Sequence, residues 1–289
     1  MIRSFLFVPA DSERKMRSAF VSKADALILD LEDSVAAESR PDARLLVREN
    51  VEGRDDTWVR INPLDTEDAD LDLEAIMPGA PTGIVLPKPQ SAADAIDLAF
   101  RLDELETANK LEPGRTRILP ICTERPEALF SLGGYAGATE RLAGLSWGAE
   151  DLAAAVGASA NRDADGAWLQ PYEFARSMCL FAAAAAEVPA YDTVYTDFRD
   201  LDGLSVYASN ARRDGFSGMF AIHPGQIDVI NDAFRLRDEE IERAQRIVDL
   251  FKANPGTGTL GLDGEMIDRP HLIQAQRILD LAAAIEKKQ

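Results

Sequence analysis

Short apolar runs along the chain each stop at a polar or charged side chain, and the stops recur about once per strand-plus-helix unit. They fall at Asp30, Arg60, Lys88, Glu124, the pair Glu150 and Asp151, and His223. The runs between the stops alternate with longer helical patterns. This alternation predicts a parallel sheet built from βαβ units.

The pattern predicts eight strands, and eight βα units close into a (β/α)₈ TIM barrel of the α/β class. The predicted strands are 4–8, 26–31, 57–61, 83–87, 117–122, 142–147, 193–195 and 218–222. The predicted helices include 12–21, 91–109, 171–187, 226–234 and 238–253, the first two with Ser12 and Ser91 as N-caps. A barrel places the C-terminal ends of all its strands on one face, so the polar stops should converge on one pocket.

The chain continues beyond the eightfold pattern. We predict a barrel domain over residues 1–253 and a C-terminal tail over 254–289, which begins with a Gly/Pro-rich loop and ends in a helix from about Pro270. The tail shows no strand of its own. It is therefore either a cap over its own barrel or an arm that contributes to a neighbouring subunit's active site.

Composition narrows the range of partners. The formal net charge of −19 opposes binding to nucleic acid or to an anionic membrane, although a local cluster of cations in a cleft would still bind a small anion. Cys122 and Cys179 form neither a zinc-type spacing nor a disulfide framework, which favours a reducing cytoplasm. No segment reads as a signal peptide or a membrane span, so we expect a cytoplasmic protein.

Glu124 and Asp151 are the strongest candidates for metal binding. They follow successive predicted strands, so their carboxylates should approach each other at the barrel mouth, where they would repel unless a cation separated them. Mg²⁺ suits such a site because it takes few protein carboxylates and keeps several waters or substrate oxygens. The alternative is that either residue is a solvated or helix-capping acid.

Asp30, Glu32 and Asp33 form a dense acidic group directly after a wholly apolar strand. They are candidate catalytic residues that would hold metal-bound water or an arginine, although at least one would serve as a helix N-cap. Arg60 ends the next strand, where its planar donor fork would clamp a carboxylate or stabilise an enolate. A structural salt bridge to Asp30 or Glu32 is the alternative for Arg60.

For three further polar residues, the sequence leaves both a role in the site and a structural role possible. Lys88 lies between two prolines that fix its direction, and it would either bind substrate or form an ion pair at the rim. Glu150, beside Asp151, is a candidate for binding substrate together with Arg60, Lys88 and Glu124. His223 precedes Pro224, and a lone histidine there is more often a structural donor than a base.

These residues, in this order, resemble the citrate lyase β-subunit-like family of the HpcH/HpaI aldolase superfamily, whose relatives include malyl-CoA, citramalyl-CoA and citryl-CoA lyases. The resemblance covers essentially the whole chain. The matching segments are 3–11, 27–33, 59–62, 86–88, Glu124, 147–152, 221–227 and 264–270. Three positions depart from the family pattern: Arg125-Pro126 stands where Thr-Ala is common, Met219 where a lysine is common, and Leu236-Arg237 where Pro-Ser is usual.

The resemblance implies a TIM barrel, Mg²⁺ held by Glu124 and Asp151, and Arg60 at the substrate. It also implies a homotrimer or a hexamer, in which Asp268 of the tail reaches a neighbouring active site as a catalytic residue. The expected enzyme is a carbon–carbon lyase that acts on a carboxylated 3-hydroxyacyl-CoA and yields an acyl-CoA and an oxo-acid. A CoA-thioester hydrolase, a condensing enzyme similar to malate synthase and a non-catalytic subunit of a larger lyase complex are the alternatives.

Overall fold

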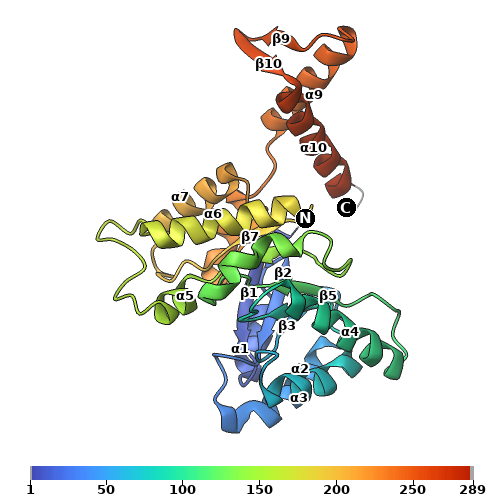
Figure 1. Ribbon diagram of the computed structural model, residues 1–289, viewed down its shortest axis with the longest axis vertical. Coiled ribbons are helices and arrows are strands. Elements are labelled where there is room, and N and C mark those ends of the chain that lie inside the picture. The colour runs from blue at the N-terminus through green and yellow to red at the C-terminus, as the bar shows by residue number, and fades with distance from the viewer. Residues whose placement is uncertain (1, 287–289) are drawn as a thin grey trace. The chain divides into compact units, whose positions relative to one another are not determined.

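The computed structural model describes residues 2–286, and eight parallel strands form a nearly closed barrel at its centre (Figure 1). The strands are β1 (Ser4–Pro9), β2 (Ala26–Asp30), β3 (Thr57–Arg60), β4 (Gly83–Leu86), β5 (Arg117–Pro120), β6 (Leu145–Ser146), β7 (Ala190–Asp192) and β8 (Gly218–Ala221). They follow the order β5-β4-β3-β2-β1-β8-β7-β6. Parallel bridges between Ile118 and Leu142 and between Ile121 and Ser146 join β5 to β6. The predicted (β/α)₈ class is confirmed.

Aromatic side chains fill the inside of the barrel. The Phe5 ring meets Trp58, Tyr191 and Phe220 edge to face, with ring centroids 5.6, 4.9 and 5.8 Å away. Gly83 leaves room for this layer, because a Cβ there would lie 2.3 Å from the Trp58 ring. The larger apolar core lies between the strands and the surrounding helices, as the near-continuous apolar strands predict.

Helices follow most strands around the barrel (Figure 1). They are α1 (Glu13–Phe20), α2 (Arg40–Val51), α3 (Glu67–Ile76), α4 (Ala92–Ala108), α5 (Ala149–Ala155), α6 (Gln170–Ala185), α7 (Leu201–Asp214) and α8 (Ile227–Ala233). The 3₁₀ segments are η1 (Ala37–Ser39), η2 (Met77–Gly79), η3 (Pro126–Tyr135) and η4 (Pro224–Gln226). Ser12 and Ser91 cap α1 and α4, accepting from the N–H of Lys15 and of Ala93, as predicted. Within residues 2–286 no helix is both long and apolar enough to cross a membrane.

A buried ion pair joins α4 to the segments that flank β5. Glu106 accepts from the backbone N–H of Gly114 and Thr116, at 2.7 and 2.8 Å, and from both terminal nitrogens of Arg141, at 2.7 and 2.9 Å. Burial alone would raise the pKa of Glu106, but Arg141 and the two N–H groups lower that pKa to about 2.

The seventh strand lies earlier than the sequence predicts. We expected it at 193–195, whereas β7 spans Ala190–Asp192 and pairs with β6 and β8. Its last residue is a fully buried carboxylate, which an apolar pattern does not reveal. The predicted segment instead follows the strand, and Thr193 and Val194 line a cleft at the mouth.

Arg235 begins a second compact unit, whereas residues Ile2–Phe234 form the first. The second unit contains α9 (Asp238–Ala253), β9 (Thr259–Leu262), β10 (Glu265–Asp268) and α10 (Arg269–Glu286). Helix α9 packs against α10 around Ile247, Val248 and Ala275, so this division falls before α9 and not after residue 253, where we had placed it.

The tail also contains a β-hairpin, so the expectation that it has no strand is wrong. Strands β9 and β10 are antiparallel, and the turn between them is Asp263-Gly264 with φ angles of 52° and 85°. Positive φ at both central residues is the geometry of the type I′ turn, for which Asp-Gly is a preferred sequence.

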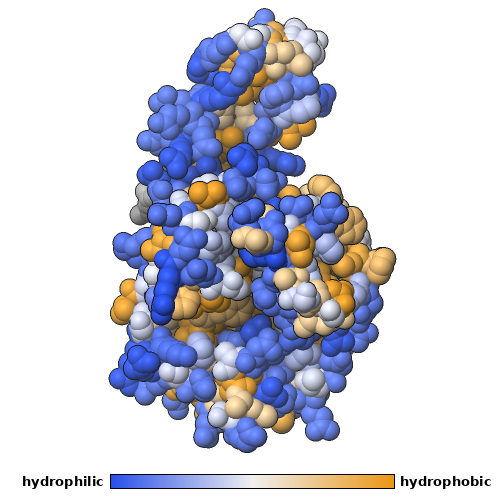
Figure 2. All heavy atoms as spheres, turned by 90° about the vertical axis from the view of Figure 1, so that its left-hand side faces the viewer, coloured by the Kyte–Doolittle hydropathy of each residue, from blue (hydrophilic) through white to orange (hydrophobic). Residues whose placement is uncertain are grey.

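Charged and polar side chains dominate the face shown in Figure 2, where hydrophobic residues occur in scattered groups. This surface agrees with the net charge of −19.

Candidate active site

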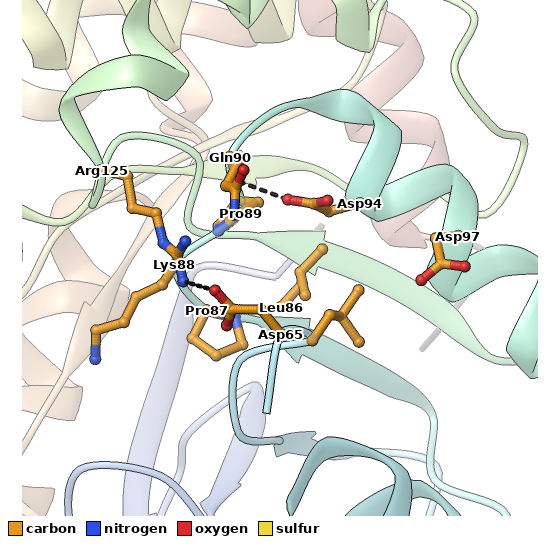
Figure 3. A pocket seen from close by; sticks show the side chains of 10 residues that line it. Asp65, Leu86, Pro87, Lys88, Pro89, Gln90, Asp94, Asp97 and Arg125 are labelled. Atoms are coloured by element: carbon orange, nitrogen blue, oxygen red, sulfur yellow. Dashed lines mark hydrogen bonds and ion pairs between the residues drawn. The ribbon is translucent and has the colours of Figure 1, made fainter. Parts of the chain in front are cut away.

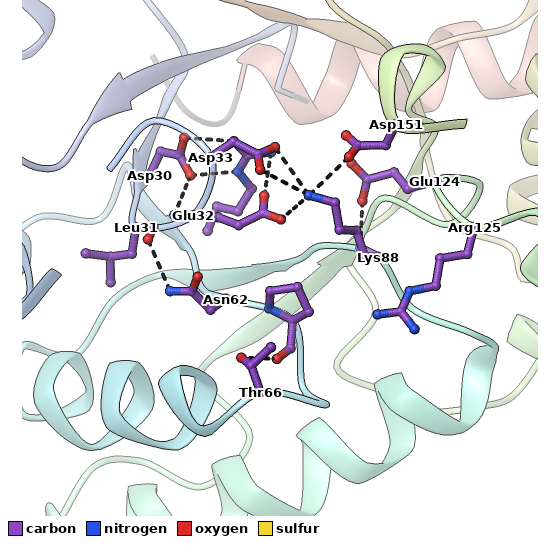
Figure 4. Close-up of polar contacts among 12 residues, drawn as sticks. Asp30, Leu31, Glu32, Asp33, Asn62, Thr66, Lys88, Glu124, Arg125 and Asp151 are labelled. Carbon is purple, nitrogen blue, oxygen red and sulfur yellow. Dashed lines mark hydrogen bonds and ion pairs between the residues drawn. The ribbon is translucent and has the colours of Figure 1, made fainter. Parts of the chain in front are cut away.

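The polar stops from five successive βα units gather at the C-terminal mouth of the barrel (Figure 4). Asp30 and Arg60 end β2 and β3, Lys88 follows β4, Glu124 follows β5, and Asp151 lies in the first turn of α5. The arrangement arises from the parallel topology, because the register pairs Asp30 with Arg60 directly across neighbouring strands.

Arg60 is held by acidic groups from the β2 end. Its Nε and Nη2 donate to the two carboxylate oxygens of Asp30, both at 2.7 Å, and its Nη1 lies 3.0 Å from Glu32 Oε2. The guanidinium also sits over the Phe7 ring, 4.8 Å from its centroid. Burial opposes the charge, but Asp30 and Glu32 raise the pKa of Arg60, so it stays cationic.

The acids around Arg60 differ in their protonation behaviour. Burial would raise the pKa of Asp30, but the charge and hydrogen bonds of Arg60 outweigh it and lower that pKa. For Glu32 the balance is reversed, since burial raises its pKa more than Arg60 and Lys88 lower it. The salt bridge that we had kept as an alternative for Arg60 is therefore present, and it fixes the guanidinium in a cleft that Arg60 itself lines.

Lys88 lies among acids from several strand ends. Its ammonium pairs with Glu32 and lies 3.1 Å from both Asp33 Oδ1 and Asp151 Oδ1. Its backbone N–H donates to Glu124 Oε2 at 2.6 Å. Partial burial opposes the charge of Lys88, but Glu32, Asp151 and Glu124 together raise its pKa.

Glu124 is a buried carboxyl group with an excess of negative charge nearby. Burial, and then the charges of Asp151 and Glu32, raise the pKa of Glu124 well above its ordinary value, although Arg60 and the Lys88 N–H act in the opposite direction. Gly148 leaves the space that Glu124 fills, because a Cβ there would lie 2.5 Å from Glu124 Cγ. A cation placed between Glu124 and Asp151 would relieve this repulsion.

A cleft of about 360 Å³ opens over these groups. Its lining combines the charged side chains of Arg60, Glu124 and Asp151 with apolar side chains, among them Phe7, Trp147, Val194, Phe220 and Ile222. Glu150 also lines this cleft, but it is exposed and accepts from Asn161 Nδ2 at 2.9 Å.

A smaller pocket of about 130 Å³ lies beside the mouth and contains Arg125. Arg125 pairs with Asp65 at 2.8 Å, and Figure 3 shows the Lys88 side chain extending away from Asp94 and Asp97, which line the same pocket. Arg125 follows Glu124 directly, yet its charge is already balanced by Asp65 outside the acidic group.

Two other predicted residues belong to other elements of the chain. His223 caps η4, where its Nδ1 accepts from the Gly225 N–H at 3.0 Å, and its ring stacks on Phe198 at 5.0 Å. His223 therefore makes a structural contact, but its ring nitrogen accepts a hydrogen bond where we expect a donor. Asp268 ends β10 in the second unit, where its Oδ1 lies 2.5 Å from His271 Nδ1.

Asp192 is a polar residue of the mouth that the sequence analysis missed. It is fully buried at the end of β7, and its carboxylate accepts from Trp147 Nε1 at 2.7 Å, from Tyr207 Oη at 3.0 Å and from Arg176 Nε and Nη2 at 3.0 and 2.8 Å. Trp147 directly precedes Gly148 and α5, so this network fixes the segment that leads to Asp151. If the seventh strand is placed at 190–192, Asp192 becomes a charged residue at a strand end, which is the pattern that indicates the other site residues.

The donor set at the mouth fits Mg²⁺. Glu124 and Asp151 supply hard carboxylate oxygens, and among the described residues no group of three or more His, Cys, Asp or Glu side chains is arranged as a metal cage. Mg²⁺ is usually bound through one or two carboxylates while it keeps waters or substrate oxygens, unlike structural zinc. Glu124 is buried and has the charges of Asp151 and Glu32 acting on it, so a divalent cation held by Glu124 and Asp151 would offset negative charge at this place.

Comparisons with known proteins agree with this geometry. The family described as HpcH/HpaI aldolase/citrate lyase matches residues 3–224. The chain is 34% identical over 286 residues to the citrate lyase subunit beta of Haemophilus influenzae, covering 97% of this chain and 96% of that protein. It is 33% identical over 306 residues to the mitochondrial citramalyl-CoA lyase of Rattus norvegicus, covering 99% and 87%.

Solved structures show the same similarity. CitE of Mycobacterium tuberculosis in complex with magnesium, acetoacetate and coenzyme A has a TM-score of 0.80 and 35% identity, over 97% of this chain and 98% of that one. The citrate lyase beta subunit of M. tuberculosis complexed with oxaloacetate and magnesium has a TM-score of 0.69 and 37% identity, over 80% and 96%.

Proposed function

Because the chain belongs to the HpcH/HpaI aldolase/citrate lyase family and is a lyase, we propose that it is a Mg²⁺-dependent enzyme that cleaves a carboxylated 3-hydroxyacyl-CoA. Malyl-CoA, citramalyl-CoA and citryl-CoA are substrates of this class. The products are an acyl-CoA and an oxo-acid. The observation that carries the proposal is the placement of Glu124 and Asp151 beside a fixed Arg60 in one cleft.

Glu124 and Asp151 would hold the Mg²⁺ ion. When bound, Mg²⁺ supplies Lewis acidity and a template for the hydroxyl and carboxylate oxygens of the substrate. Relatives whose structures contain magnesium with acetoacetate or oxaloacetate support Mg²⁺ as the ion, and the positions of Glu124 and Asp151 in this cleft support them as its ligands.

Side chains of the protein would stabilise the negative charge of the enolate and transfer the protons. A carboxylate that lines the cleft, with Asp33 as the candidate, would accept the hydroxyl proton. The adjacent carbon–carbon bond then breaks, the oxo-acid leaves, and the electron pair stays on the thioester as an enolate. Arg60 is already cationic and oriented by Asp30, so it would stabilise the enolate oxygen without reorganising. Asp268 of a neighbouring subunit, in a homotrimer or a hexamer, would deliver the proton to the enolate carbon.

A second cleft adjoins the first and would take the CoA part of the substrate. It measures about 360 Å³ and shares Phe7, Pro9 and Ile222 with the cleft that contains Arg60. Arg14 and Lys15 line it, and their positive charges suit the phosphates of CoA in a chain that is otherwise strongly acidic. The shared residues would place the thioester at the boundary between the two clefts.

The test is turnover by the purified chain. Malyl-CoA, citramalyl-CoA and citryl-CoA are supplied with Mg²⁺, and the acyl-CoA and oxo-acid products are followed by chromatography. We expect cleavage that stops in chelator and returns with Mg²⁺. Release of free CoA without an oxo-acid would instead indicate a thioester hydrolase, and no turnover of any member would favour a non-catalytic subunit.

A further inference from the structure

Lys88 makes more contacts with acids than a rim ion pair requires. Its ammonium contacts Glu32 and Asp33, which follow β2, and Asp151 in the first turn of α5, while its backbone N–H donates to Glu124. Figure 4 shows the ammonium between the Glu32 and Asp33 carboxylates on one side and Asp151 on the other. Lys88 therefore occupies the position of a cation in contact with one of the two proposed metal ligands.

The backbone of Lys88 is also unusual. Its φ angle is 47°, in the left-handed region that residues other than glycine rarely adopt, and it lies between Pro87 and Pro89. Such a conformation is unfavourable for a residue with a Cβ and persists where the surroundings impose it, often at functional sites. The two prolines restrict the neighbouring backbone, so the side chain is aimed into the acidic group.

The charge balance of the mouth explains what the ammonium does there. Five carboxyl groups, those of Asp30, Glu32, Asp33, Glu124 and Asp151, surround two cations, Arg60 and Lys88. Arg60 is committed to Asp30 and Glu32. Lys88 is thus the side chain that lies against Asp151 and offsets its negative charge.

We propose that the Lys88 ammonium acts as a counter-cation for Asp151: it pairs with this carboxylate in the metal-free protein, and Mg²⁺ replaces it there when the metal binds. The inference rests on the proposed function, since it takes Glu124 and Asp151 as the magnesium ligands. On metal binding the ammonium keeps Glu32 and Asp33, so only its contact with Asp151 is exchanged. Lys88 then lowers the magnesium affinity of the site.

The test is a titration of the metal-free, full-length protein with MgCl₂ by isothermal calorimetry, a readout that does not involve turnover. Groups around metal ligands commonly change affinity by about 10- to 100-fold, so Lys88→Met should bind Mg²⁺ about tenfold more tightly than the wild type. Lys88→Arg keeps the charge and should stay close to the wild type. Lys23→Met, which removes an exposed lysine paired with Asp228, is the matched control and should not change affinity.

Thermal unfolding gives a second readout. In chelator the Lys88→Met protein should melt below the wild type, because the acids lose their counter-cation, and Mg²⁺ should raise its melting temperature more than that of the wild type. Unchanged or weaker magnesium binding by both Lys88→Met and Lys88→Gln would overturn the inference.

Asp151→Asn separates this inference from the proposed function. If Asp151→Asn binds Mg²⁺ as well as the wild type, the metal assignment itself is wrong. If Asp151→Asn loses the metal while Lys88→Met is unchanged, only the role of Lys88 is wrong.

Discussion

Asp30 and Arg60 face each other across neighbouring strand ends and form two parallel hydrogen bonds, both of 2.7 Å. The two parallel hydrogen bonds fix the orientation of the guanidinium plane as well as the position of its charge. A lysine would keep the charge but lose the plane, because its ammonium is a point charge on a flexible stem.

Arg60→Lys should therefore lower the rate of cleavage by about 100- to 1,000-fold, the typical cost of losing one donor to a developing oxyanion. Steady-state kinetics at saturating Mg²⁺ measures the effect, with Arg17→Lys, at an exposed helical ion pair, as the control. A normal turnover number for Arg60→Lys would show that Arg60 does not stabilise the enolate and has only a structural role in its salt bridge.

Gly148→Ala should disturb the mouth through one side chain. The new Cβ would lie 2.5 Å from Glu124 Cγ, so the proposed ligand must move, and we expect magnesium binding to weaken by about tenfold or more. Calorimetric titration measures the affinity. Gly133→Ala is the matched control, because nothing lies within 4 Å of a Cβ there and its φ is not positive. Equal affinities in the two variants would contradict the placement of Glu124.

Glu106→Gln should show a stability defect that depends on pH. The folded-state pKa of Glu106, about 2, lies below its ordinary value of 4.5, so its carboxylate stabilises the fold above pH 4.5 and loses this effect as the pH falls towards 2. The difference in free energy of unfolding between wild type and variant should be largest near pH 7, up to roughly 3 kcal/mol, and should shrink as the pH falls.

Urea unfolding at pH 7, 5 and 3.5 measures the free energy of unfolding for this comparison. Glu104→Gln, exposed on the same helix, is the control. A gap of constant size at all three pH values would show that Glu106 acts by packing and not by its charge.

Asp268 and Arg60 should complement each other between subunits if the active site is shared. Asp268→Ala and Arg60→Ala proteins, each inactive alone, should regain part of the activity after they are unfolded, mixed and reassembled. Some sites would then combine an intact Arg60 with an intact Asp268 from the neighbour. Verified mixed oligomers without activity, or a monomer that is active alone, would rule out the shared site.

The sequence was sufficient for the barrel and for the region of the site, because both follow from strand ends. An apolar run that ends at a charged residue indicates a strand and its C-terminal end together, and this pattern indicates Asp30 and Arg60 at the ends of β2 and β3 and Glu124 shortly after β5. Their convergence follows from the parallel topology, while their catalytic roles stay predictions.

Other features could not be derived from the pattern. The carboxylate of Asp192 is buried by partners from distant segments, so its strand carries no apolar signature at that position, and β7 was placed too late. The contacts of Lys88 depend on a backbone with positive φ, which the sequence Pro87-Lys88-Pro89 does not indicate, since a residue before proline usually has an extended backbone. The hairpin was missed although its Asp263-Gly264 turn is visible in the sequence, because the flanking strands are short and mostly exposed.

The hydrogen bonds around Asp192 constrain how its four residues can change during evolution. Trp147, Arg176 and Tyr207 each donate to this one carboxylate, and a buried acceptor that loses a donor costs about 1–3 kcal/mol. Substitutions at these four positions should therefore be inherited together. A descendant that replaced the aspartate would need to repack α6, α7 and the segment after β6 at once, so these four residues are expected to change far more slowly than exposed positions of the surrounding helices.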